Sequence, residues 1–190
     1  ARIHPSQARR VELLRSQGDI YLTRYHQPAD AATCYRRALD LSPDDPDLAR
    51  FPVAYMAEPG YMFLTEGEVA GFRAYLRKGG FVIFDDFAEE RGGWAPFEYQ
   101  MNRVIPGGRW YELDGTHQIF HAFFEIPEPL TFLPPYEGQE PPRYMGLFED
   151  NDQNKRLLAI VNFNNDISEY WEYSGQGFAP VPEANEAYKL

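Results

Sequence analysis

Two adjacent carboxylates, Asp85 and Asp86, follow the apolar run 81–84. Paired carboxylates at the end of a buried strand could exchange a proton in acid–base catalysis or hold a divalent cation. They could equally cap the strand, because an aspartate accepts hydrogen bonds from the backbone amides of the next loop. Open α/β sheets place ligand crevices beyond the carboxyl ends of their strands, so the position leaves all three roles open.

Two histidines, His117 and His121, are spaced i and i+4. On a helix this spacing puts both rings on one face, as in many metal sites, but no glutamate follows His117 as it does in zinc proteases. A metal or catalytic role would need Asp85 or Glu125 as a further group. The alternative is that the two rings pack and cap a turn among the neighbouring phenylalanines.

Nucleophilic catalysis has little support in the sequence. The single cysteine, Cys34, falls inside an expected helix, on its packed face, whereas a thiol nucleophile needs a strand-to-helix elbow. No Gly-x-Ser-x-Gly, Walker loop or Gly-x-Gly-x-x-Gly occurs. We therefore expect no cofactor and, on balance, no enzymatic activity.

The segment 162–178 combines amide, carboxylate and aromatic side chains, a mixture that suits a sugar ring, a protein partner or an ordered loop across the sheet end. Trp94, beside a Gly-Gly pair, is either another exposed anchor or part of the core. Within the segment, the candidate binding residues are Asn164, Asn165, Asp166, Tyr170 and Trp171.

The elements that would position these residues alternate between strand and helix. Strands are expected at 52–56, 81–84, 109–113, 143–149 and 156–163, and helices at 65–78, at 96–105 and from 182 onward. A short helix or turn is expected at 117–124. The fully apolar run 81–84 indicates a central parallel strand. The pattern predicts a doubly wound α/β sheet, mostly parallel, with an antiparallel edge formed by 143–149 and 156–163.

A helical hairpin precedes this domain, with helices expected at 7–25 and 29–41. It resembles one tetratricopeptide repeat in the positions of Gly18, Tyr21, Ala31, Ala38 and Pro43. One repeat does not bury its own apolar face, and repeats of this kind usually bind proteins, so the resemblance favours a scaffold role over a generic hairpin. The expected domains are therefore 1–46 and 47–190.

Charge divides the chain near the same boundary. The net charge is −11 overall, +1 over residues 1–50 and −12 over residues 51–190. A surface this acidic repels phosphate backbones, so the main domain is not expected to bind nucleic acid. No apolar run approaches the roughly 20 residues that span a bilayer, so any membrane association is expected to be peripheral, through a partner.

Residues 45–190 resemble the bacterial family catalogued as domain of unknown function 4159. The resemblance rests on DPDLARFPVAYMAEPGYMFLTEGEVAGFRAYLRKGGFVIFDDF, on THQIFHAFF and on NFNNDISEYWEYSGQGFAPVPEANEAYKL. It implies a fold of the flavodoxin type related to class I glutamine amidotransferases. It also implies export, with a periplasmic or another exported location, while a cytoplasmic location stays open, and it establishes no biochemical activity.

These observations favour a non-catalytic binding or assembly module in a larger, extracytoplasmic bacterial complex. A purely structural subunit differs from this only in having no exchangeable ligand. The alternative is a hydrolase or carbohydrate-active enzyme that uses Asp85 and Asp86 with His117 or His121.

Overall fold

The computed structural model describes residues 5–24, 37, 52–126, 141–177 and 179–190. The chain divides into two compact units, residues 1–52 with 64–80 and residues 53–63 with 81–190. We call the second the sheet unit. Within the described residues, no helix is both long and apolar enough to cross a bilayer.

The first unit contains the helices α1 (Pro5–Thr23) and α3 (Glu66–Arg77). A capping box starts α3, as predicted: Glu68 N donates to Thr65 Oγ1 at 3.3 Å, and Thr65 N donates to Glu68 Oε2 at 2.8 Å. Gly79, at φ 112°, follows its end. The helix expected at 29–41 lies outside the described residues apart from residue 37, so the repeat-like hairpin stays a prediction.

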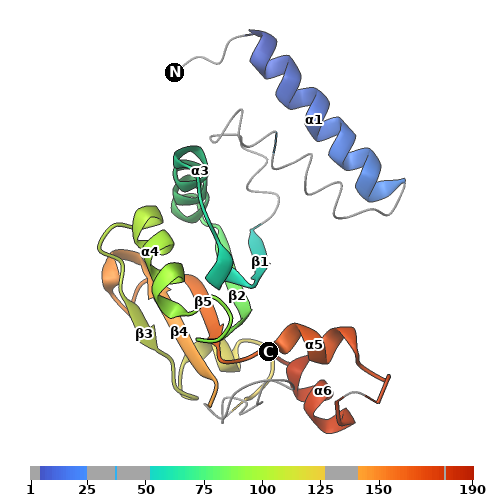
Figure 1. The fold of residues 1–190 in the computed structure, drawn as a ribbon, viewed down its shortest axis with the longest axis vertical. Helices are drawn as coiled ribbons and strands as arrows, with labels where there is room; N and C mark the ends of the chain where they lie inside the picture. Colours follow the sequence, from blue (N-terminus) through green and yellow to red (C-terminus); the bar gives the residue numbers. More distant parts are fainter. Residues whose placement is uncertain (1–4, 25–36, 38–51, 127–140, 178) are drawn as a thin grey trace. The chain divides into compact units, whose positions relative to one another are not determined.

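The sheet unit is built on five strands in the order β1-β2-β5-β4-β3 (Figure 1). Neighbouring strands are parallel from β1 to β5 and antiparallel from β5 to β3. The antiparallel part is thus larger than the predicted edge, because β3 also pairs antiparallel. The bounds are β1 (Val53–Ala57), β2 (Phe81–Phe87), β3 (Trp110–Glu112), β4 (Arg143–Phe148) and β5 (Leu157–Phe163).

Aromatic rings of α4 (Trp94–Val104) pack on one side of the strands. The ring centroids of Phe97 lie 4.9 Å from Phe84 and 5.3 Å from Trp110, and Trp94 lies 5.5 Å from Phe163. The 3₁₀ turn η2 (Pro59–Tyr61) contacts α4. A Cβ on Gly60 would lie 2.6 Å from Arg91 O, so only glycine fits this approach.

A second core cluster joins the strands to the later part of the chain. It includes Phe120, Tyr144, Ile160, Ile167 and Tyr170, all at most 7% exposed. The cluster includes residues of η3 (Gln118–His121) and α5 (Ile167–Glu172), and Ala187 joins α6 (Val181–Ala187) to it. A further 3₁₀ turn, η4 (Glu149–Asn151), begins the β4–β5 connection. The helix α5 was not predicted; it lies inside the segment 162–178.

Candidate functional site

The sequence predicted that Asp85 would lie just beyond the end of its strand, but in the structure it lies within β2, which continues to Phe87. It pairs with Ala57 of β1 and is 0% exposed. Its Oδ2 accepts hydrogen bonds from the hydroxyl of Tyr55 on β1 and, at 3.1 Å, from the backbone N–H of Ser168 on α5. Its Oδ1 is buried without a hydrogen-bond partner. Asp85 therefore ties two strands to the start of a helix.

The surroundings of Asp85 favour its neutral form. Burial raises the pKa of Asp85 to about 7, and the charge of Asp166 adds to the shift, while the hydrogen bonds from Tyr55 and Ser168 oppose it. The pKa of the Tyr55 hydroxyl is raised as well, first by burial and then by Asp85, so this hydroxyl keeps its proton and remains a hydrogen-bond donor near neutral pH. One proton can thus be held on Asp85 in the physiological range.

Asp86, the next residue of β2, lies at the irregularity in the pairing with β5 and adopts a left-handed conformation, with φ 59°. This is uncommon for a residue with a side chain, although aspartate tolerates it better than most. Its backbone N–H donates to Asn165 O at 3.1 Å, and its Oδ1 accepts from Arg91 Nη1 at 3.0 Å. Burial and the nearby Asp166 raise the pKa of Asp86 to about 6, although Arg91 acts in the opposite direction.

The start of α5 adds two further acidic groups. Asp166 is 5% exposed and caps the helix, because its Oδ1 accepts from Glu169 N at 3.1 Å and from Ser168 Oγ at 2.7 Å. Burial, together with Asp166 and Asp86, raises the pKa of Glu169 to about 7. Glu169 Oε2 is also buried without a hydrogen-bond partner.

We call these four residues the strand-end carboxylate cluster: Asp85, Asp86, Asp166 and Glu169. Burial, together with the repulsion between neighbouring carboxylates, raises the pKa of Asp85, Asp86 and Glu169, so these three side chains can hold protons near neutral pH. Such groups can transfer protons in catalysis, or they can make the packing of α5 depend on pH. No group of three acidic, histidine or cysteine side chains among the described residues is arranged to bind a metal ion.

The two histidines do not join this cluster. His117 Nδ1 accepts from Ile119 N at 3.3 Å, and its ring packs edge-on against Phe148 with centroids 5.8 Å apart. His121 Nδ1 lies 2.7 Å from Glu125 Oε2, and its Nε2 lies 2.7 Å from Gly115 O. These two contacts raise the pKa of His121, whereas burial lowers that of His117. The i, i+4 spacing does not bring the rings to a common partner, because η3 is a short 3₁₀ turn.

The predicted binding residues serve mainly as packing groups in the structure. Trp94 belongs to the aromatic layer of α4. Asn165 and Tyr170 are 1% and 7% exposed, and Trp171 packs 5.6 Å from Tyr55 while its Nε1 donates to Ala187 O at 2.9 Å. Asn164 adopts φ 56° and its backbone N–H donates to Phe87 O at 3.0 Å. Whether any of them also contacts a partner stays a prediction.

Sequence reasoning missed several members of the site, including Tyr55, Arg91, Ser168 and Glu169. One signal was present: Asp166 followed three residues later by Glu169 is the spacing of a helix N-terminus. No comparable pattern marks Tyr55, which lies 30 residues before Asp85 and meets it only through the pairing of β1 with β2.

The sequence was compared with models of known protein families, and one family model matches most of the chain. The model of the family described as Domain of unknown function (DUF4159) matches residues 17–190. The chain belongs to the DUF4159 family. The match begins upstream of the expected domain boundary, so DUF4159 includes much of the region predicted to be a separate hairpin. No curated protein matches the chain.

Proposed function

We propose that this DUF4159 chain is a non-catalytic binding or assembly module, a component of a larger extracytoplasmic bacterial complex. The observation that supports this most is a pair of surface rings. Phe123 and Phe124, which follow η3 after Ala122, are 88% and 42% exposed, and their ring centroids lie 4.7 Å apart in an edge-to-face arrangement. An exposed pair of phenylalanines on a strongly acidic protein suits the apolar recess of a protein partner.

The strand-end carboxylate cluster supports the same proposal. Its innermost member, Asp85, is fully buried and is already bound by Tyr55 and Ser168. Neither His117 nor His121 contacts it, so the catalytic pairing expected for a hydrolase is not assembled. In this proposal the sheet resembles that of an amidotransferase but lacks the thiol nucleophile, so the domain binds a protein partner and does not catalyse a reaction. The extracytoplasmic location rests on the family resemblance.

The test is affinity capture from an extract of the native bacterium followed by mass spectrometry. The double variant Phe123→Ser/Phe124→Ser should lose a protein that the wild type captures. The control Val181→Ser, which replaces an apolar residue 64% exposed on α6, should retain it. The proposal fails if the wild type stays monomeric and captures nothing, or if the double variant captures the same protein.

An acid–base enzyme is the second candidate, because the pKa values of Asp85 and Glu169 are raised to about 7 and that of Asp86 to about 6. Asp86 is the more accessible aspartate, since 16% of its side chain is exposed. A substrate converted by the wild type and not by Asp86→Asn would favour this candidate over the binding module.

A further inference from the structure

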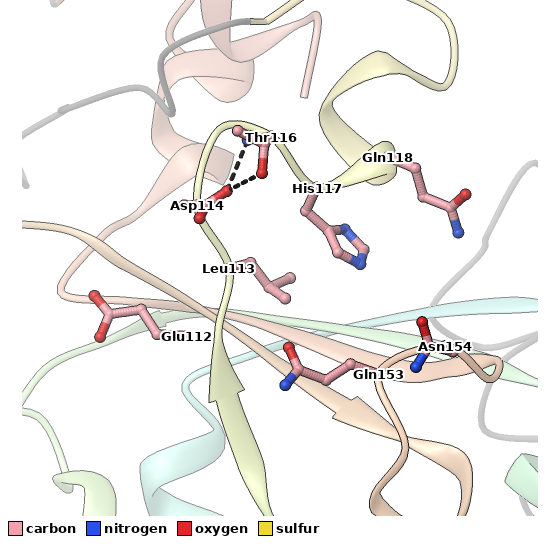
Figure 2. Close-up of a pocket in the computed structure, with 8 residues that line it drawn as sticks. All are labelled: Glu112, Leu113, Asp114, Thr116, His117, Gln118, Gln153 and Asn154. Carbon is pink, nitrogen blue, oxygen red and sulfur yellow. Dashed lines mark hydrogen bonds between the residues drawn. The ribbon is translucent and has the colours of Figure 1, made fainter.

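A polar cavity of about 460 Å³ lies between the chain after β3 and the turn between β4 and β5 (Figure 2). In Figure 2 the ring of His117 extends from the start of η3 towards the turn that bears Gln153 and Asn154. The volume falls within the range of small-molecule sites. Its lining residues are Glu112, Leu113, Asp114, Thr116, His117, Gln118, Gln153 and Asn154.

The two carboxylates of the cavity already have partners. Asp114 Oδ1 accepts from the backbone N–H of Thr116 at 2.8 Å and from its hydroxyl at 2.5 Å. These hydrogen bonds lower the pKa of Asp114, so it stays ionised. Glu112 lies 3.5 Å from Arg143 in an exposed ion pair. The charges of the cavity are therefore partly satisfied before any ligand arrives.

Among the neutral side chains of the cavity, Thr116 donates to Asp114 and Asn154 donates to Asp152. The side-chain amides of Gln118 and Gln153 form no hydrogen bond with any residue that the structure describes, and both residues are exposed. Because His117 Nδ1 accepts from Ile119 N, the proton of its neutral ring is on Nε2, which has no partner among the described residues either. The cavity thus offers one imidazole N–H and two amides, each amide able to donate and to accept.

We propose that this cavity binds a neutral, polyhydroxylated ligand, a sugar or another polyol. Hydroxyl groups both donate and accept, and this matches two amides beside an imidazole N–H. An anionic ligand would meet Glu112 and Asp114 with no lysine or arginine among the eight lining residues. A cationic ligand would compete with Arg143 for Glu112 and with Thr116 for Asp114. The lining excludes Phe123 and Phe124, so the proposal is independent of the protein-binding surface.

The test is a nuclear magnetic resonance titration of the ¹⁵N-labelled chain. The probes are glucose, maltose and sorbitol, with spermidine as the cation and citrate as the anion. At least one neutral probe should cause a saturable shift of the side-chain NH₂ signals of Gln118 and Gln153, while spermidine and citrate should leave them in place. Gln118→Ala and Gln153→Ala should each weaken binding about fivefold, the effect of one neutral hydrogen bond.

The control variant is Gln176→Ala, which removes an exposed amide outside the cavity and should bind the probe as the wild type does. Gln118 and Gln153 are exposed, so their alanine variants should keep the wild-type melting temperature. The proposal is overturned if no neutral probe shifts these signals, if only spermidine or citrate does, or if both alanine variants bind as tightly as the wild type.

Discussion

Replacement of Asp85 by asparagine should reduce the pH dependence of stability of the sheet unit. The pKa of Asp85 is about 7 in the folded protein, against an ordinary aspartate value of 3.8. Between these values the folded protein holds a proton that the unfolded chain has released. The free energy of unfolding therefore falls as the pH rises through this interval, and the contribution of Asp85 is most favourable at low pH.

The size of the effect follows from the same two values. Each pH unit between 5 and 7 costs about 1.4 kcal/mol, so Asp85 alone should make the wild type roughly 2 to 3 kcal/mol less stable at pH 8 than at pH 5. Asparagine keeps an oxygen that can accept from Tyr55 and Ser168 but does not ionise. In Asp85→Asn, the difference in the free energy of unfolding between pH 5 and pH 8 should therefore be smaller than in the wild type by this amount. This holds even if the substitution changes the stability at both pH values.

The assay is urea unfolding at pH 5 and pH 8, followed by tryptophan fluorescence. All three tryptophans (Trp94, Trp110 and Trp171) lie in the sheet unit, so the signal reports that unit. The control is Glu98→Gln, which removes an exposed carboxylate of α4. If Asp85→Asn keeps the full wild-type difference between the two pH values, the neutral, buried state of Asp85 is refuted.

Three further predictions use the same assay. Arg91→Met should raise the pKa of Asp86 above about 6 and destabilise the protein by about 1 kcal/mol at pH 8 and by less at pH 5; an equal loss at both pH values would contradict this. Gly60→Ala should cost about 1 to 3 kcal/mol, because its Cβ would lie 2.6 Å from Arg91 O; a neutral effect would show that η2 can move. Phe97→Ala should cost about 3 to 5 kcal/mol, since Phe97 is 0% exposed at the centre of the aromatic layer, and a loss below 1 kcal/mol would argue against that packing.

Much of the strand and helix pattern could be predicted because residues close together in the chain determine it: apolar runs mark buried strands, and capping residues and turns mark where elements begin and end. The apolar run 81–84 indicated a buried strand, and β2 lies between β1 and β5 at the middle of the parallel part. Thr65 and Glu68 indicated the start of α3 because a capping box is made by neighbouring residues in the chain. The turn at 149–155 indicated the antiparallel pairing of β4 with β5 for the same reason.

The site was harder to predict because long-range contacts assemble it. Asp85 was expected beyond the strand, yet β2 continues to Phe87 through an irregular pairing with β5, and this continuation buries Asp85. The contact between Asp85 and Ser168 joins residues 83 positions apart. The polar residues of the segment 162–178 were compatible with a sugar site, a partner surface or an ordered loop, and the sequence did not choose between them. In the structure Asn165 and Asp166 are buried because they form hydrogen bonds with β2 and α5.

The central claim, that the exposed phenylalanines form a protein-binding surface, is tested most directly by photo-crosslinking. A photoreactive phenylalanine analogue is placed at position 123 in one sample and at position 181 of α6 in another, and each protein is irradiated in cells of its native organism. We predict one dominant crosslinked protein from position 123 and none from position 181. Equal, non-specific crosslinking from both positions, or none from position 123, would contradict the claim.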